Sequence, residues 1–415
     1  MHISNDKKKL IENSIAIALT QVVSYIIPLI SLPYLSRVLG VEKFGLVFWA
    51  QSCIMYFIIF TEYGFNLSSV REIAINKNNI NKISEIFNSV LFIKLFLIAI
   101  SLSILSIIII LVPKFNSEWL LFYLTFFMVI GNSIYPMWFF QGIEHMKYIT
   151  FLNILTKSIF LILIFCFIRK PSDYIYVAVL NSLGFLISGI IAILIAVIKF
   201  KVKLFIPSKE TIIKEFKSST EFFFARASET LYTNTNSFLL GIVANPVLVG
   251  YYVAAEKICN AVRYLMDPIG VTLYPYMSKS KNIKLYKKIL YISLLIIFLI
   301  CIFVYFFSPK IIVLFYGRAM YPAYKILQIF CITIFISVFS GLIGYPFLGA
   351  LGFPNIVNRS LPIAAGIQIL ILFLFYIAGV LNIKTITYLT ILPYSIMLII
   401  RLYSILKLKL WSYND

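Results

Sequence analysis

The sequence predicts an all-α polytopic membrane protein of about twelve transmembrane helices, arranged as two six-helix bundles. Hydrophobic residues make up 61% of the 415-residue chain and charged residues only 13%, which is far from the composition of a soluble protein. Apolar runs of about 20 residues, the length needed to cross a bilayer as a helix, follow one another with short breaks. The loops between these runs alternate between rich and poor in lysine and arginine, as the loops of a multi-pass protein do.

Breaks at proline, glycine and charge clusters divide the chain into twelve predicted spans. The first is expected to be retained in the membrane, because its apolar run is too long for a signal peptide and no small-residue cleavage site ends it. The predicted spans are 12–36, 44–66, 87–112, 119–141, 149–168, 174–198, 216–243, 249–276, 285–307, 322–350, 357–381 and 384–406.

The basic residues predict the orientation of these spans. One set of loops holds most of them, including Lys7–Lys9, Lys199–Lys203 and Lys279–Lys288. Positive loops stay on the cytoplasmic side, so both termini are expected to be cytoplasmic, in agreement with an even number of spans. Because the formal net charge of +20 is spread over the ends of apolar runs, it does not indicate a nucleic-acid partner.

An internal repeat relates the two halves of the chain. Phe44-Gly45-Leu46 corresponds to Val249-Gly250-Tyr251, and Tyr135-Pro136 corresponds to Tyr345-Pro346. Each half would hold six spans, so the halves are predicted to be parallel repeats. The expected domains are an N-terminal bundle (1–198), a basic cytoplasmic linker (199–215) and a C-terminal bundle (216–415).

Two neighbouring spans each carry a line of polar and charged residues. At about 100° per residue, the members of each line fall on one face of a helix. A charge at mid-bilayer costs roughly 2.5–3.5 kcal/mol, so these faces are expected to meet a partner or a wet cavity. The first line is Ser219, Arg226, Glu229, Thr230, Thr233 and Ser237; the second, read as one continuous helix, is Tyr252, Glu256, Asn260, Arg263, Asp267 and Tyr274.

Five local motifs give the chain a recognisable resemblance. They are Pro33-Tyr34-Leu35-Ser36-Arg37-Val38-Leu39-Gly40, Glu62-Tyr63-Gly64-Phe65-Asn66-Leu67 with Arg71-Glu72, Trp138-Phe139-Phe140-Gln141-Gly142, Gly250-Tyr251-Tyr252 with Ala255-Glu256-Lys257, and Leu273-Tyr274-Pro275-Tyr276. With these motifs the chain resembles the bacterial lipid-linked oligosaccharide (O-antigen) flippases, the Wzx-type members of the polysaccharide-exporter superfamily. The last two spans contribute no motif to the match.

The resemblance implies a fold, a substrate and a location. Its relatives are twelve-helix transporters with two bundles around a V-shaped, cationic central cavity. They carry an undecaprenyl-diphosphate-linked oligosaccharide from the cytoplasmic to the outer leaflet of the inner membrane by alternating access, in antiport with H⁺ or Na⁺. Other surface-polysaccharide assembly proteins are expected partners. The resemblance does not distinguish a repeat unit of lipopolysaccharide from one of capsule or another surface glycan.

Cations inside the spans are the candidate ligands of the diphosphate. Guanidinium groups pair with phosphate oxygens in a bidentate manner, which favours Arg226 and Arg263. Lys257 belongs to the same set, although it lies off the line of Glu256. Lys94 and Lys157 are second-tier candidates; both could instead extend to the cytoplasmic interface, and this is the favoured interpretation of Lys94.

Carboxylates and neutral polar groups complete the predicted site. Four carboxylates could bind the coupling ion or balance the arginines: Glu62, Glu229, Glu256 and Asp267. The polar cavity lining is expected to include Gln21, Ser24, Gln51, Thr233 and Asn260. The alternative is static ion pairing, of Arg226 with Glu229 and of Arg263 with Asp267, without a role in transport.

Other function classes fit the sequence less well. An enzyme of surface-glycan assembly, a polymerase or glycosyltransferase, would need a large extramembrane loop or an acidic metal-binding cluster, and the sequence shows neither. A multidrug exporter of the same superfamily would favour an anionic cavity. No metal or cofactor is expected, because the five cysteines lie in apolar runs without ligand spacing and there are only two histidines.

Overall fold

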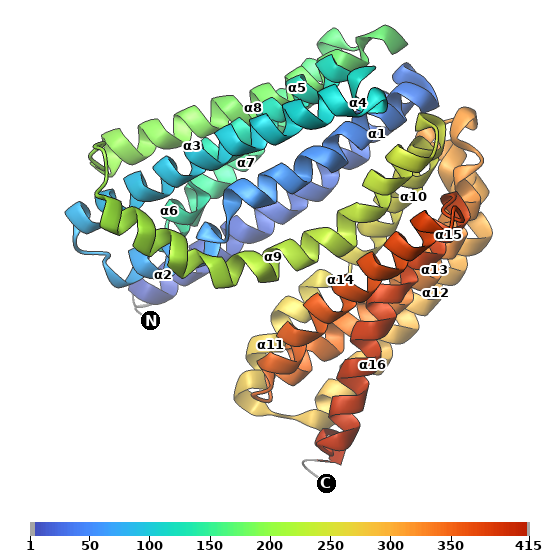
Figure 1. Cartoon of the computed structure of the whole chain (residues 1–415). Helices are drawn as coiled ribbons and strands as arrows, with labels where there is room; N and C mark the ends of the chain where they lie inside the picture. Colours follow the sequence, from blue (N-terminus) through green and yellow to red (C-terminus); the bar gives the residue numbers. More distant parts are fainter. Residues whose placement is uncertain (1–4, 413–415) are drawn as a thin grey trace. The chain divides into compact units, whose positions relative to one another are not determined.

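The computed structural model describes the backbone of residues 5–412, and the side chains of these residues apart from 5–18, 225, 226, 229 and 412. The described part is helical and contains no strand (Figure 1). It divides into two compact units, which do not follow the two halves of the chain. The N-terminal unit comprises Met1–Leu39 and Ala50–Ala227, and the C-terminal unit comprises Gly40–Trp49 and Ser228–Asp415.

The N-terminal unit contains most of α1 and the helices up to the first part of α9. Within it, α8 packs along α5 and α7, and α2 packs against α6. The helices are α1 (Asn5–Glu62), α2 (Phe65–Ile75), α3 (Ile80–Leu111), α4 (Pro113–Asn116), α5 (Trp119–Ile134), α6 (Met137–Gly142), α7 (Met146–Phe167), α8 (Tyr174–Leu194) and α9 (Lys209–Val243), with a 3₁₀ turn at Pro171–Asp173 and a π-helical turn at Ile195–Lys199.

The C-terminal unit is built around α13, which packs against α10, α12 and α16, while α14 packs against α16. Its helices are α10 (Pro246–Tyr264), α11 (Asp267–Ser280), α12 (Ile283–Tyr316), α13 (Ala323–Ile343), α14 (Pro354–Ile377), α15 (Ile383–Leu389) and α16 (Ile391–Lys407), with 3₁₀ turns at Arg318–Met320 and Leu410–Ser412 and a π-helical turn at Gly344–Gly349.

The Glu62-Tyr63-Gly64 motif holds the start of α9 in the N-terminal unit. The Tyr63 ring stacks on Phe216 at 4.4 Å and on Phe223 at 4.8 Å between ring centroids. The Ser68 and Ser219 hydroxyl oxygens are 2.6 Å apart, which adds a buried hydrogen bond between α2 and α9. This motif therefore docks α9 through stacked aromatic rings and a polar contact.

The basic segment before α9 is fastened to the N-terminal unit by Asn88 on α3. The Asn88 amide nitrogen donates to the carbonyl oxygen of Lys203 at 2.7 Å, and its oxygen accepts from the Phe205 backbone N–H at 3.2 Å. The predicted linker 199–215 is thus partly a packed strap. Along the chain, the boundary between the two compact units falls inside α9, after Ala227, and not in this segment.

A short stretch of α1 belongs to the C-terminal unit. At Gly40 the backbone takes φ 70°, a left-handed conformation that glycine adopts at low cost, and α1 kinks there. The following turn packs closely on α10: a Cβ on Gly45 would lie 1.9 Å from the carbonyl oxygen of Pro246 and 2.8 Å from the nitrogen of Gly250. Gly45 and Gly250 are the two glycines that the sequence repeat pairs.

Nine helical segments in the described part are long and apolar enough to cross a membrane. One of them, Leu19–Ile75, has 57 residues, about 85 Å of helix, and covers the first two predicted spans. Those nine do not include α9, α10 and α11, which carry the polar lines. The protein is a multi-pass membrane protein; the number twelve stays a prediction.

Candidate functional site

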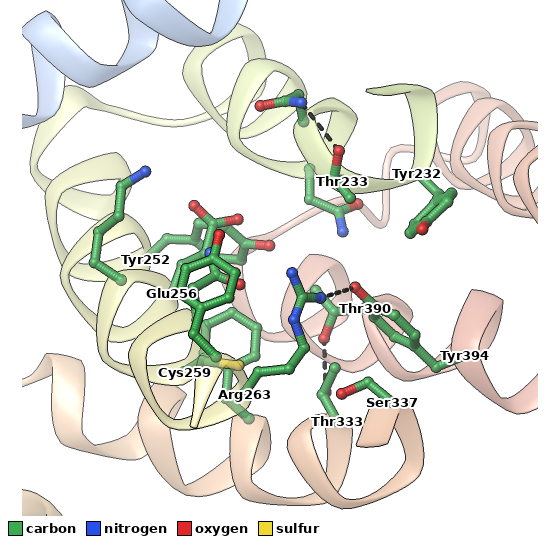
Figure 2. A pocket seen from close by; sticks show the side chains of 16 residues that line it. Tyr232, Thr233, Tyr252, Glu256, Cys259, Arg263, Thr333, Ser337, Thr390 and Tyr394 are labelled. Carbon is green, nitrogen blue, oxygen red and sulfur yellow. Dashed lines mark hydrogen bonds between the residues drawn. The ribbon is translucent and has the colours of Figure 1, made fainter. Parts of the chain in front are cut away.

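A polar cavity of about 320 Å³ lies inside the C-terminal unit (Figure 2). Four parts of the chain line it: the second half of α9, α10, α13 and the region where α15 meets α16. The lining residues are Tyr232, Thr233, Asn234, Asn236, Tyr252, Glu256, Lys257, Cys259, Asn260, Arg263, Tyr264, Phe330, Thr333, Ser337, Thr390 and Tyr394.

The start of α10 is fixed by its sequence. Asn245 caps the helix by accepting a hydrogen bond from the Leu248 backbone N–H at 3.0 Å, and Pro246 occupies the first turn, where its missing N–H costs nothing. From this start, helical spacing carries Glu256, Asn260 and Arg263 along one face into the cavity. The members of the second polar line that precede Tyr264 therefore lie together in the cavity wall.

The rest of that line is separated from the cavity. The prediction of one continuous helix through Tyr274 is wrong, because α10 ends at Tyr264 and α11 begins at Asp267. Pro268 in the first turn of α11 explains the break, since a proline has no N–H to donate to the carbonyl four residues earlier, that of Tyr264, and its ring crowds that carbonyl. Asp267 is exposed on α11 and is not among the residues that line the cavity.

Arg263 is held by tyrosines. Its Nη1 donates to the phenolic oxygen of Tyr394 at 2.7 Å, and its guanidinium lies 5.7 Å from the centre of the Tyr264 ring. The Tyr232 ring packs edge-on against Tyr394, with centroids 5.8 Å apart. Among the described residues no carboxylate oxygen lies within 4.0 Å of the guanidinium, so the described structure does not contain the Arg263–Asp267 pair of the static alternative.

One acidic and one further basic group share the cavity. The Glu256 carboxylate lies near Ser237 of α9, and its neighbouring charges are those of Lys257 and Arg263. The Lys257 ammonium lies 5.6 Å from the centre of the Phe48 ring, in the stretch of α1 that belongs to this unit. Figure 2 shows Glu256 and Arg263 on the same wall of the cavity.

The remaining wall is made of hydroxyl and amide groups. The hydroxyl oxygens of Thr333 and Thr390 are 3.1 Å apart, and the Asn234 amide donates to the Thr233 hydroxyl at 3.0 Å. These groups can donate and accept hydrogen bonds, as sugar hydroxyls do. Tyrosine rings beside them supply apolar faces. The arrangement suits a polyol bearing negative charge, and the described residues contain no cluster of metal ligands.

The predicted candidates divide between the two units. Arg263, Glu256, Lys257, Asn260 and Thr233 line the cavity. The side chains of Arg226 and Glu229 lie outside the described part of the structure, so their predicted ion pair stays a prediction. The candidates in the N-terminal unit, which do not line this cavity, are Glu62, Lys94, Lys157, Gln21, Ser24 and Gln51.

Lys94 corrects one expectation. Its side chain is only 2% exposed, so it does not extend to the interface as favoured from the sequence. The reason is its position on α3, where it shares a buried face with Val90 and Leu97, and Glu62 is the acid whose charge acts on it. Lys157 on α7 is partly exposed.

Several lining residues were not found from the sequence. Their only signal is spacing: Thr333 and Ser337, and likewise Thr390 and Tyr394, lie four residues apart, on one face of an otherwise apolar helix. Because single hydroxyls occur widely in membrane helices, this signal does not distinguish a cavity wall from helix packing. Tyr232 shows the same spacing to Asn236, which also lines the cavity.

The chain is similar in sequence to proteins of one family. The model of the family described as "Polysaccharide biosynthesis protein" matches residues 10–281. A protein of Escherichia coli (strain K12) named "Putative O-antigen transporter" is 34% identical over 277 residues, 67% of each chain. A protein of the same name from Shigella dysenteriae is 30% identical over 319 residues, covering 74% of this chain and 78% of its own.

Two solved structures share the fold. An inward-facing multidrug resistance MATE transporter of the MOP superfamily aligns with a TM-score of 0.69 at 13% identity, covering 94% of this chain and 96% of its own. The lipid II flippase MurJ, in an inward closed conformation, also aligns with a TM-score of 0.69, at 15% identity over 97% of this chain and 89% of its own. The fold is that of these transporters, and the chain belongs to the polysaccharide biosynthesis protein family.

Proposed function

We propose that this protein moves a lipid-linked oligosaccharide, of the O-antigen type, from the cytoplasmic to the outer leaflet of a bacterial inner membrane. The observation that carries the proposal is the polar cavity around Arg263, set within a multi-pass protein of this family. The names of the two sequence relatives support an O-antigen substrate, and the lipid II flippase supports the transport of a lipid-linked sugar.

In this proposal Arg263 holds the diphosphate. The hydrogen bond to Tyr394 uses one N–H of the guanidinium, which leaves other donors for phosphate oxygens. A guanidinium pairs with phosphate in a fixed, two-point geometry, and the phenol already holds it in place. The hydroxyl and amide groups of the cavity then receive the first sugar residues.

Glu256 is the proposed site of ion coupling. Glu256 lies in the same cavity as Arg263, and the positive charge of Arg263 acts on its carboxylate. A phosphate bound at Arg263 would disfavour the ionised carboxylate, so substrate binding and proton or Na⁺ binding would be linked. Glu256→Gln should then bind substrate but transport it independently of the ion gradient in reconstituted vesicles; a variant that still follows the gradient would remove Glu256 from coupling.

The function itself is tested by deleting the gene in its host. Undecaprenyl-diphosphate oligosaccharide should accumulate on the cytoplasmic leaflet, and surface glycan should disappear. Re-expression should restore export. Normal surface glycan in the deletion strain, where no second flippase gene is present, would contradict the proposal.

A drug-export function gains no support from the cavity. The MATE likeness is at 13% identity and concerns the fold. The cavity is lined by two cations, Arg263 and Lys257, and one carboxylate, Glu256, so its net positive charge would repel a drug cation. Deletion should therefore leave susceptibility to cationic drugs unchanged.

A further inference from the structure

A second cavity in the C-terminal unit lies away from the polar cavity. It has a volume of about 530 Å³, and none of its lining residues is shared with the first. Residues from the starts of α10, α13 and α15 and from the later part of α12 form it. The predicted topology places this end of the unit at the outer face of the membrane, opposite the lysine-rich segment 279–288.

Two lysines give the cavity a positive charge. Lys325 on α13 and Lys384 on α15 both line it, and both are exposed. Neither ammonium has a carboxylate oxygen within 4.0 Å among the described residues; Lys325 lies 6.0 Å from the centre of the Tyr324 ring instead. Two cations from separate helices therefore converge on one cavity without an acidic partner.

The surrounding sequence offers no acid that could neutralise them. Residues 268–414 contain 13 lysines and arginines and not one aspartate or glutamate. The predicted outer face is otherwise poor in cations, as expected for a bacterial membrane protein. The charge complement of Lys325 and Lys384 therefore comes from outside this part of the chain. Glu42, in the stretch 40–49 of the same unit, already has the Lys43 ammonium 4.0 Å away, so an anionic ligand is the better complement.

The rest of the lining is apolar and aromatic. Ile329, Ile332 and Ile383 form an aliphatic wall, and Ile332 is 50% exposed. Tyr305 and Tyr388, 46% and 57% exposed, stand at the rim. Tyrosines prefer the level of lipid head groups, where the ring is apolar and the hydroxyl can donate a hydrogen bond. A water-soluble anion would leave this aliphatic wall unused.

We propose that this cavity binds an anionic membrane phospholipid. The phosphate of its head group lies between the ammonium groups of Lys325 and Lys384, and the tyrosine hydroxyls donate to its oxygens. The first part of an acyl chain lies along the isoleucines. The lipid is a resident of the predicted outer leaflet and is distinct from the carried substrate.

Native mass spectrometry of the purified full-length protein tests the proposal. Phosphatidylglycerol and phosphatidylcholine of matched chain length are titrated against the wild type, Lys325→Gln, Lys384→Gln and the double variant. Arg318→Gln is the control, since Arg318 is an exposed cation seven residues from Lys325 that does not line the cavity. The expected loss of phosphatidylglycerol affinity is about fivefold for each lysine and about 30-fold for both.

Each outcome of the lipid titration either supports the proposed site or overturns it. A preference for phosphatidylglycerol that the double variant loses and Arg318→Gln keeps supports the site. Equal affinity of the wild type for both lipids, or full binding by the double variant, overturns it. Farnesyl diphosphate is added as a competitor: if it binds more tightly than phosphatidylglycerol and depends on the same lysines, the occupant is the carried lipid and the proposal fails. None of these readouts depends on transport.

Discussion

A phenol, and no described carboxylate, holds the guanidinium of the half-buried Arg263. We expect Arg263→Ala to insert normally but to lower glycan export by about 10–100-fold, the value of a charge-assisted hydrogen bond. Lys should restore export only in part, because an ammonium keeps the charge without the planar fork. Arg359→Ala is the matched control, because Arg359 is an exposed arginine of α14 outside the cavity, and this variant should retain export.

The double variant Arg263→Ala/Asp267→Ala separates the two interpretations of this residue. If Arg263 served only to balance Asp267, removal of both charges would restore export. Since Asp267 lies on another helix and outside the cavity, we expect no restoration. Export of surface glycan by the double variant, at normal protein level, would refute the phosphate-binding role.

Glu215 at the start of α9 is a buried carboxylate of the N-terminal unit. Its side chain is 2% exposed, and its Oε2 has no hydrogen-bond partner among the described residues. Burial raises the pKa of Glu215 to about 7, and the nearby charge of Glu72 adds to this. Lys214 and Lys82 act in the opposite direction, and Glu85, which forms an ion pair with Lys82 at 2.6 Å, raises the pKa further.

This pKa predicts a pH-dependent stability. The folded state binds the proton of Glu215 more tightly than the unfolded chain, whose carboxyl has its ordinary pKa of 4.5. Its contribution is therefore complete below about pH 4.5 and is lost as the pH rises to about 7, at up to roughly 1.4 kcal/mol per unit of pKa difference. Glu215→Gln, which mimics the protonated form, should raise the melting temperature in detergent at pH 8 and change it little at pH 5.

The exposed carboxylate of Glu221 on the same helix provides the control. Glu221→Gln should leave the melting temperature nearly unchanged at both pH values. A stabilisation by Glu215→Gln that is equal at pH 5 and pH 8 would show that titration is not its cause.

At this scale the sequence predicted part of the site. A charge in an apolar helix is costly, so Glu256 and Arg263 stood out from their surroundings and do line the cavity. Tyr394 and Thr333 did not, because a hydroxyl in a membrane helix can bond to its own backbone and needs no cavity. The partner of Arg263 comes from a helix 131 residues away, and helical periodicity carries no information at that range.

At the scale of elements, α10 and α11 show that a proline in the sequence does not by itself predict whether a helix ends there. Pro268 ends one helix and begins the next, whereas Pro28 and Pro33 lie inside α1. In a membrane both results are possible, because neighbouring helices and side chains can satisfy the carbonyl groups that a proline frees. A proline therefore marks a candidate break, and tertiary packing decides whether the helix continues.

The close contact of α1 with α10 at Gly45 predicts how substitutions of glycine affect stability. A methyl group on Gly45 would meet the backbone of Pro246, which cannot move aside as a flexible side chain would. Gly45→Ala should therefore lower stability by about 1–3 kcal/mol. Gly366 in α14 has no heavy atom within 4 Å of its Cβ position, so Gly366→Ala should be neutral or stabilising by up to about 1 kcal/mol. Equal melting temperatures for the two variants would contradict the close approach.

At the scale of the whole molecule, topology can be tested with reporter fusions. The distribution of basic residues predicts cytoplasmic signals for fusions after Lys203 and Lys284 and external signals near Asn245 and Gly317. The first three positions in chain order, Lys203, Asn245 and Lys284, bracket the two least apolar predicted spans, and Gly317 follows the next span. A cytoplasmic signal at Asn245 would reduce the number of crossings and remove the parallel repeat.

The fold class was predictable from the sequence because lipid imposes one strong rule. Backbone groups in a bilayer must bond within their own helix, so long apolar runs are helices. The count was harder, since α9 and α10 carry charged and polar residues and are not among the nine candidate spans of the described part. The division into compact units was hidden for another reason: it depends on how the ten residues Gly40–Trp49 pack, and no composition change marks them.

Those ten residues make the two halves of the gene interdependent. Phe44 and Trp49 are 0% and 1% exposed in the C-terminal unit, although they are encoded in the first eighth of the chain. A fragment 207–415 made alone would lack them and should be degraded, while co-production with fragment 1–206 should rescue it. Chimaeras built to exchange glycan specificity between relatives should therefore inherit residues 40–49 from the same parent as the C-terminal half.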